Sequence, residues 1–491
     1  MLPLKTFLKV GTIIGEGVRA HTIEKVTTEA IYLRGHPEAQ RGEKDNRNGA
    51  LRIIPTVVIE DIIRGLESNV IQLDDIMRKR GDEKTEDLFS MLGVDHDKFI
   101  LGYDSTIYKL CELWQKLSSQ NPNQVKAGLF PETNLKLFRK QSHSDFTQAG
   151  LRVSDSLLLR FGASLLAKRF LILTGLSGSG KTKLAHAFAS WFTESEDQYR
   201  LVAVGADWTT NENVIGYQDA LQPSLYRKPS NGLLEVILRA AADADRPYFL
   251  ILDEMNLSHV ERYFADILSA IESRQEIALH ASAESLKSCE NDTLLVPSKI
   301  GLPKNLFIIG TVNVDETTYM FSPKVLDRAN VIEFRATAED ISTFLDKPSA
   351  VDMEILAGKG AAFGATFVTE AAAELQLKPA TAAELKARLA EVFAALAPIG
   401  AEFGFRTVYE ISRFAHFHDK LTGDGWQFND ALDAQVLQKL MPKLHGSQRR
   451  LEPVLKVLEA FCTTYQCNAS LEKIRRMQDR LKDGFTSFAE A

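Results

Sequence analysis

The chain has 491 residues, enough for about two to four domains with a sizeable core. Its composition is that of an ordinary globular protein, with 45% hydrophobic and 25% charged residues. A net charge of −7 argues against a protein that coats nucleic acid over its whole surface, although local basic patches remain compatible with it. The 4 cysteines are too few and too scattered for a disulfide framework or a zinc knuckle, and no stretch has the length of a membrane span. We therefore expect a cytoplasmic protein without a membrane contact.

The expected elements divide the chain into four parts. Residues 1–120 mix β-branched stretches such as LRIIPTVVIE with later helical patterns, which predicts an N-terminal α+β module for targeting or recognition. Residues 121–150 have the polar, turn-forming composition of a linker. In residues 151–335 short apolar strands alternate with helices, the pattern of an α/β subdomain with a parallel sheet. Alanine- and leucine-rich helices follow in residues 336–491 and predict an all-helical end domain.

The stretch LTGLSGSGKT, residues 173–182, fits the phosphate-binding loop pattern in full. An apolar strand ends at Gly175, and a helix opens at Lys181-Thr182. In this pattern the loop N–H groups surround the phosphates, Lys181 reaches the outer phosphates, and the Thr182 hydroxyl binds Mg²⁺. The alternative is a chance glycine-rich turn. The candidate nucleotide-binding residues are Gly175, Ser177, Gly178, Ser179, Gly180, Lys181 and Thr182.

Two acidic residues follow the apolar run in YFLILDEMN, residues 248–256. Ligands of open α/β sheets bind at the carboxyl ends of the strands, where Asp253 and Glu254 are expected. Asp253 would hold Mg²⁺ together with Thr182, and Glu254 would be the base that orients the attacking water. An exposed strand end with two acids is the alternative.

A second apolar run, NLFIIGTVN, ends at Asn313, whose amide can bind the attacking water without adding charge. Further along, LDRAN places Arg328 at an expected helix end. A guanidinium there could reach the phosphate of a neighbouring subunit and offset the charge of the transition state. The alternative is an ion pair of Arg328 with Asp327 or Glu333.

Four segments together carry a family resemblance: GLSGSGKT, LDEMNLSHVERYFADILSAIES, GTVNVDETTYMFSPKVLDRAN and FGFRTVYEISRF. Over about residues 150–450 the chain resembles the AAA+ ATPases of the McrB type, the NTP-hydrolysing subunits of methylation-dependent restriction systems. The resemblance implies a P-loop core with a helical lid and a hexameric ring with sites between subunits. It also implies that Asn313 is the sensor-I residue, Arg328 the interface arginine and Arg406 the sensor-II cation of the lid. Arg413 is the competitor of Arg406, because it lies seven residues further on the same helical face.

The expected function is Mg²⁺-dependent hydrolysis of GTP or ATP by a motor subunit of a restriction or defence complex. The resemblance implies a McrC-like nuclease as partner and DNA as a ligand of the N-terminal module. A MoxR-like ATPase that remodels protein clients is the alternative, and a nucleotide-gated scaffold with little turnover is a third reading. Asp315 follows Asn313 one residue earlier than the acid of the founding McrB proteins, which leaves the choice between GTP and ATP open.

Overall fold

The computed structural model describes residues 135–289, 294–314, 321–346 and 350–491, together with four strands before residue 56. The chain forms two compact units, residues 1–133 and 134–491.

The described part of the first unit is an antiparallel sheet of four strands in the order β1-β2-β3-β4. These strands are β1 (Ile13–Ile14), β2 (His21–Val26), β3 (Ala30–Gly35) and β4 (Leu51–Pro55). The pairing of β2 with β3 shifts register between Ile23 and Lys25. The helical pattern that we expected before residue 120 lies outside the described residues.

The second unit begins with a helix where the sequence predicted the end of a linker. Helix α7 (Leu135–Gln148) buries Phe138 completely. The Phe138 ring lies 6.1 Å from that of Phe188 and 5.5 Å from that of Trp191. The linker prediction was wrong for this stretch. Its composition is mostly polar, but its few aromatic residues, among them Phe138, are enough to pack α7 against the second unit.

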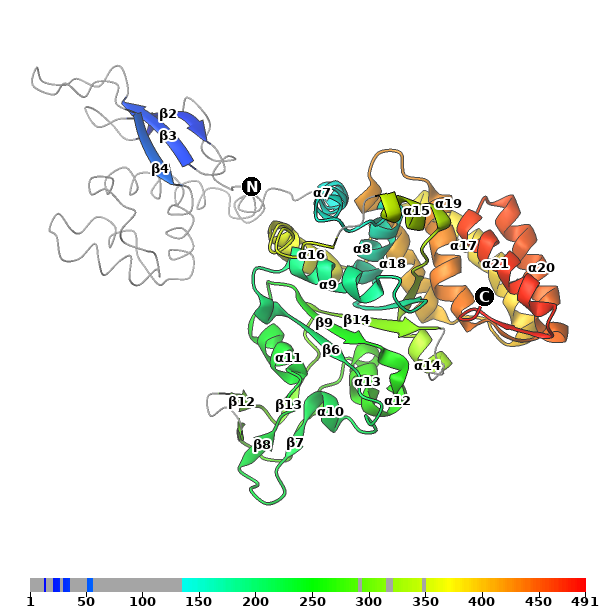
Figure 1. The fold of residues 1–491 in the computed structure, drawn as a ribbon, viewed down its shortest axis with the longest axis horizontal. Helices are drawn as coiled ribbons and strands as arrows, with labels where there is room; N and C mark the ends of the chain where they lie inside the picture. The colour runs from blue at the N-terminus through cyan, green and yellow to red at the C-terminus, as the bar shows by residue number, and fades with distance from the viewer. Residues whose placement is uncertain are drawn as a thin grey trace, which may run out of the picture. The chain divides into compact units, whose positions relative to one another are not determined.

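A parallel sheet of five strands lies at the centre of the second unit, in the order β15-β5-β14-β9-β6 (Figure 1). The strands are β5 (Phe170–Gly175), β6 (Tyr199–Ala203), β9 (Tyr248–Asp253), β14 (Leu306–Asn313) and β15 (Asn330–Glu333). The second unit is thus a mixed α/β structure with a parallel sheet and many helices, as the sequence predicted. Strand β14 pairs with β5 on one side and β9 on the other, so the ends of these three strands are neighbours.

Helices cover both faces of this sheet. Phe249 and Phe307 share one face, because they are register partners, and Phe192 packs against Phe249 there with ring centroids 6.0 Å apart. Phe170 belongs to the other face, where its ring lies 6.3 Å from that of Phe264. The helices around the sheet include α8 (Asp155–Ala167), α9 (Lys181–Phe192), α11 (Leu233–Ala242), α12 (Val260–Tyr263) and α13 (Ala265–Ser273).

Two smaller sheets stand apart from the central strands (Figure 1). One has the order β12-β11-β8-β7, from β7 (Tyr217–Gln218), β8 (Leu225–Arg227), β11 (Leu286–Ser288) and β12 (Leu295–Val296). The other pairs β10 (Ile277–Ala278) with β13 (Lys299–Ile300). Short helices α10 (Glu212–Ile215) and α14 (Pro323–Leu326) precede β7 and β15.

The residues after 336 are mostly helical, as expected. Their helices are α15 (Ala338–Asp346), α16 (Gly364–Ala372), α17 (Pro379–Leu396), α18 (Phe405–Thr422), α19 (Phe428–Gln435), α20 (Gln448–Thr464) and α21 (Asn468–Leu481). The prediction that they are entirely helical was wrong, because β16 (His445–Ser447) pairs with β17 (Phe485–Ser487). These strands are three residues long, too short to leave a periodic pattern in the sequence.

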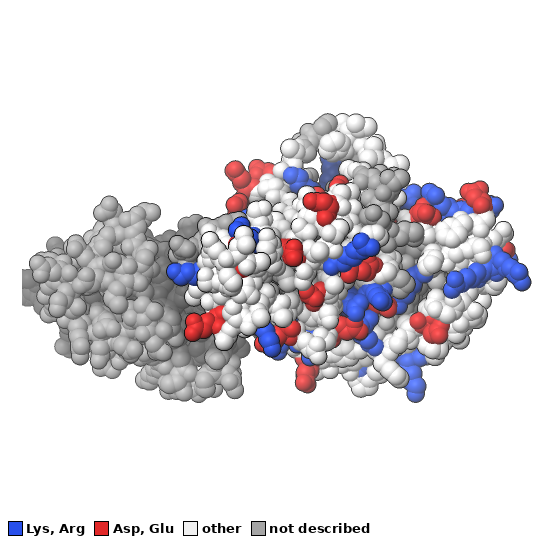
Figure 2. All heavy atoms as spheres, turned by 90° about the horizontal axis from the view of Figure 1, so that it is seen from below, with Lys and Arg blue, Asp and Glu red and all other residues white. Residues whose placement is uncertain are grey.

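Lys, Arg, Asp and Glu side chains are interspersed over the described part of the face in Figure 2. Among the described helices, none is both long enough and apolar enough to cross a membrane.

Candidate active site

The phosphate-binding loop joins β5 to α9. At Gly175 φ is +154°, and a Cβ atom there would lie 2.2 Å from the carbonyl oxygen of Phe334, so the loop requires glycine. Lys181 is only 4% exposed, and its Nζ donates hydrogen bonds to the carbonyl oxygens of Gly175 (3.0 Å) and Leu176 (2.6 Å). The ammonium group is therefore held against the loop, within reach of an anion that the loop surrounds.

The other predicted loop residues form its outer part. Ser177 and Gly178 are exposed, and Ser179 and Gly180 are half-buried. Gly178 and Gly180 have φ values of +72° and +101°, which turn the backbone into the first residue of α9.

The hydroxyl and carboxylate expected to bind Mg²⁺ are in direct contact. Thr182 Oγ1 donates a 2.5 Å hydrogen bond to Asp253 Oδ1. Thr311 Oγ1 donates a second 2.5 Å hydrogen bond to the same oxygen, which fixes the carboxylate at the end of β9. Thr311 was not predicted from the sequence, although its place two residues before Asn313 puts it on the same side of β14.

Glu254 and Asn313 meet beside this pair. Asn313 Nδ2 donates a 3.1 Å hydrogen bond to Glu254 Oε1, and the Glu254 N–H donates to Thr311 Oγ1 at 3.1 Å. Glu254 has a left-handed backbone, with φ 51° and ψ 47°. The structure thus brings together the residues predicted after β5, β9 and β14, because the parallel register places Asn313 opposite Gly175.

The donor set fits a magnesium ion. Mg²⁺ binds hard oxygen ligands, usually one or two carboxylates together with phosphate and water oxygens. Thr182 and Asp253 supply a hydroxyl and a carboxylate oxygen 2.5 Å apart at the edge of the loop. Within the described residues, no cluster of three or more His, Cys, Asp and Glu offers a metal site made of protein ligands alone.

A cavity of about 400 Å³ adjoins the loop, and helix α21 forms one of its walls. Gly175 and Leu176 line it from the loop, and Arg476 and Arg480 line it from α21. Arg476 forms two hydrogen bonds with Glu333, at 3.0 and 3.3 Å. Arg480 lies one helical turn further, is exposed and lines the same cavity, as do the acidic residues Asp479 and Glu490. Neither arginine was predicted from the sequence, where their i, i+4 spacing in KIRRMQDR is the signal that could have suggested them.

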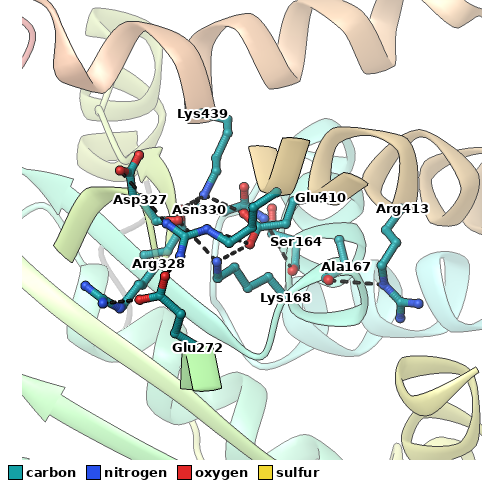
Figure 3. Close-up of polar contacts among 12 residues, drawn as sticks. Ser164, Ala167, Lys168, Glu272, Asp327, Arg328, Asn330, Glu410, Arg413 and Lys439 are labelled. Atoms are coloured by element: carbon teal, nitrogen blue, oxygen red, sulfur yellow. Dashed lines mark hydrogen bonds and ion pairs between the residues drawn. The ribbon is translucent and has the colours of Figure 1, made fainter. Parts of the chain in front are cut away.

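Arg328 lies at the amino ends of the parallel strands, whereas the loop of its own chain lies at their carboxyl ends. It precedes the first residue of β15, whereas the loop follows the last residue of the neighbouring strand β5. A strand of six residues spans about 20 Å. Arg328 donates to the carbonyl oxygen of Lys324 at 2.7 Å and pairs with Glu272, rather than with the expected Asp327 or Glu333 (Figure 3). Any action of Arg328 on a phosphate must therefore involve another copy of the chain.

Arg406 is not at the loop either, which corrects its assignment as the sensor-II cation. Its guanidinium pairs with Glu272 at 2.5 Å, and Asp327 is 3.9 Å away. Helix α18, which carries Arg406, reaches the start of β5 through Glu410, which pairs with Lys168. Sequence spacing alone does not show at which end of the strands a helix packs, and α18 packs at the amino end of β5, away from the loop.

Arg413 has a structural role. Its guanidinium is buried and donates hydrogen bonds to four carbonyl oxygens. These belong to Leu166 (3.2 Å), Ala167 (3.3 Å), Ala371 (2.9 Å) and Ala373 (2.6 Å). Because these carbonyls lie at the ends of α8 and α16, one cation satisfies groups that helix ends leave without partners.

A buried ionic cluster joins α18 to the sheet edge (Figure 3). Glu410 pairs with Lys168 and, at 2.7 Å, with Lys439. Burial, and after it the nearby charge of Lys439, lower the pKa of Lys168 to about 7, although the attraction of Glu410 acts in the opposite direction. Burial alone would raise the pKa of Glu410, but Lys439 and Lys168 together bring it below its usual value.

Asp315, whose role the sequence left open, lies outside the described residues.

Comparisons with known proteins give limited likenesses. Residues 360–485 match a family described as "Domain of unknown function (DUF8727)". No curated protein matches the chain. Among solved structures, one described as a "putative ATPase" from Cytophaga hutchinsonii is similar at 12% identity and a TM-score of 0.42, over 67% of this chain and 90% of that one.

Proposed function

We propose that the chain is a nucleoside triphosphatase of the AAA+ type. The observation that carries this proposal is the convergence of the loop with two separate strand ends. Thr182 contacts Asp253, and Glu254 contacts Asn313, all beside the buried ammonium group of Lys181. A loop that surrounds phosphates, a metal-binding pair and a base held by an amide are the parts that phosphoryl transfer to water requires.

In the proposed mechanism each residue of this edge has one task. Lys181 and the loop N–H groups bind the phosphates of the nucleotide. Thr182 and Asp253 hold Mg²⁺, which neutralises charge on the phosphates when it is bound. Glu254 accepts a proton from the attacking water, while Asn313 fixes the direction of the Glu254 carboxylate.

Two cations complete the proposed site from outside the loop. Arg480 of α21 borders the cavity beside the loop, where it would approach the outer phosphates of the same chain. Arg328 would approach the phosphates of a neighbouring protomer, because it lies at the amino ends of its own strands, away from its own loop. The site is then complete only in a homo-oligomer, for which we propose a hexameric ring.

The four motif segments support a more specific role as a McrB-like motor subunit. In this role hydrolysis of GTP or ATP would regulate a McrC-like nuclease, and the N-terminal module would bind DNA. A MoxR-like ATPase that remodels protein clients would use the same hydrolytic residues and is the second candidate.

The test is steady-state hydrolysis of GTP and ATP by the full chain with Mg²⁺, with and without duplex DNA and a McrC-like nuclease. The McrB-like role predicts that the nuclease raises turnover. Turnover that responds to neither addition favours the remodelling ATPase, and a full chain without turnover under any condition would refute the proposed activity.

A further inference from the structure

Glu272 binds two arginines with one carboxylate. It lies in the last turn of α13, where a negative charge opposes the helix dipole and gains from a cationic partner. Its Oε2 accepts from Arg328, and its Oε1 accepts from Arg406 at 2.5 Å. One guanidinium group belongs to the segment before β15, and the other belongs to the first turn of α18.

Arg328 is held by its own chain in this arrangement. One terminal nitrogen binds Glu272, and the other donates to the carbonyl oxygen of Lys324 at 2.7 Å. Only 19% of the side chain is exposed. Both contacts hold the guanidinium against its own chain, although it keeps further N–H donors, Nε among them. A movement of this group toward a phosphate of another protomer would break at least one of the two contacts.

Arg406 connects the same carboxylate to α18. It lies in the first turn of that helix, and its guanidinium also approaches Asp327 (3.9 Å) and Glu410 (4.0 Å). Because both cations contact one carboxylate, a closer approach of Arg406 adds repulsion between the two guanidinium groups, which offsets part of the attraction of Glu272 for Arg328. When Arg406 withdraws, Arg328 remains the one arginine of the pair on the Glu272 carboxylate, without this repulsion.

We propose that Glu272 is a positioning residue that restrains Arg328, and that Arg406 loosens this restraint. This inference rests on the proposed function of Arg328 and names the regulation of the same site. A shift in the first turn of α18 would change how readily Arg328 reaches the nucleotide of the neighbouring protomer. The arrangement couples the helical part of the chain to hydrolysis without a contact between Arg406 and the nucleotide.

Two substitutions should move turnover in opposite directions. Glu272→Gln removes the charge that restrains Arg328, so turnover at saturating nucleotide should rise about two- to fivefold, the range for a partly exposed ion pair. Arg406→Gln leaves Glu272 to Arg328 alone, so turnover should fall by a similar factor. KM should stay within about twofold in both variants, since neither residue is at the loop.

The matched control is Glu276→Gln, the same change at an exposed glutamate four positions further along the chain. It should leave turnover unchanged. The double variant Glu272→Gln with Arg328→Ala should be as slow as Arg328→Ala alone, because there is then no arginine to release. Thermal unfolding of each variant shows whether the fold is retained.

The outcomes separate this inference from the proposed function. If Arg328→Ala slows turnover but Glu272→Gln does not raise it, or both single variants lower it, the restraint is refuted and the hydrolytic function stands. If Arg328→Ala turns over like the unmodified chain, the proposed role of Arg328 across protomers is refuted together with this inference. If the full chain hydrolyses no nucleotide, the proposed function itself is refuted.

Discussion

Glu254 has a backbone conformation that a residue with a side chain adopts at a cost of about 1–2 kcal/mol. Three contacts hold this conformation. The Glu254 N–H donates to Thr311, its carboxylate accepts from Asn313, and the Tyr263 hydroxyl donates to the carbonyl oxygen of the next residue, Met255, at 2.8 Å. Strained residues of this kind cluster at functional sites, where the surrounding fold determines them. At Glu254 the hydrogen bond from Asn313 holds the carboxylate that this backbone conformation presents.

Thr311→Val should impair hydrolysis although the substitution hardly changes the shape of the side chain. Valine has nearly the same shape, but it leaves the Glu254 N–H without its acceptor and Asp253 without one of its two donors. We expect turnover to fall about tenfold and the free energy of unfolding to fall by about 1–3 kcal/mol, the effect of one buried unsatisfied polar group. Steady-state kinetics and urea unfolding measure the two effects.

The control for this substitution is Thr381→Val, at a buried threonine of α17. It should leave turnover unchanged. Unchanged turnover in Thr311→Val as well would show that this hydroxyl does not position the site.

At the scale of elements, α21 lies beside the cavity next to the loop, where the resemblance had implied Arg406 of α18. Arg480→Ala removes a charge that borders the cavity beside the loop, so nucleotide affinity should fall about tenfold, the worth of one charge-assisted hydrogen bond. Fluorescent nucleotide titration measures the dissociation constant. Arg475→Ala is the control, because Arg475 lies on the same helix and pairs with Glu459. Equal affinities of the two variants would contradict the role of Arg480.

The cluster between α18 and the sheet edge predicts a dependence of stability on pH. Because the pKa of Lys168 falls from 10.5 to about 7 on folding, the folded chain binds fewer protons than the unfolded chain between these pH values. The free energy of unfolding should therefore rise from pH 7 to pH 9, with a contribution of up to about 1.4 kcal/mol per pH unit from this group.

Lys168→Met should lose this contribution. Glu410 keeps Lys439 as its partner in this variant, so the remaining pair is neutral as a whole. Urea unfolding at pH 7, 8 and 9 measures the slope for both chains. Equal slopes would show that Lys168 stays protonated throughout this range.

The residues around the loop could be predicted from the sequence because their signals are local. Two apolar strands end at Gly175 and Asp253, and Lys181 follows the first of them at the spacing of the loop pattern. Parallel pairing of β5, β14 and β9 then brings these strand ends together. The sequence did not predict the place of Arg406, because the packing of α18 against α8 depends on side chains far apart in the sequence. It also missed Arg480, whose approach to the loop depends on the tertiary position of α21.

At the scale of the whole molecule, the two ends of the parallel strands carry complementary parts of one proposed site. The carboxyl ends have the residues for phosphate, metal and water, and the amino ends have Arg328. A single protomer cannot join them, since a strand of the sheet separates them. Head-to-tail contact between copies joins one end to the other and closes into a ring if the rotation permits.

Mixing two impaired variants should raise hydrolysis above that of either variant alone. Arg328→Ala keeps its loop but lacks the arginine, and Lys181→Ala lacks nucleotide binding but keeps the arginine. In a 1:1 mixture, roughly a quarter of the interfaces in a random ring combine an intact loop with an intact arginine. Turnover of the mixture should approach that fraction of the unmodified rate. A mixture no faster than the mean of its components would contradict an arginine that acts across protomers.

The most direct test of the convergence of the loop with the two strand ends on one triphosphate is to measure binding and turnover side by side in Glu254→Gln. This variant should bind GTP or ATP with Mg²⁺ within about threefold of the unmodified affinity, yet turn over at least about 100-fold more slowly, because only water activation is lost. Lys181→Ala, measured in parallel, should lose binding itself. Normal turnover in Glu254→Gln, or unchanged affinity in Lys181→Ala, would contradict the account.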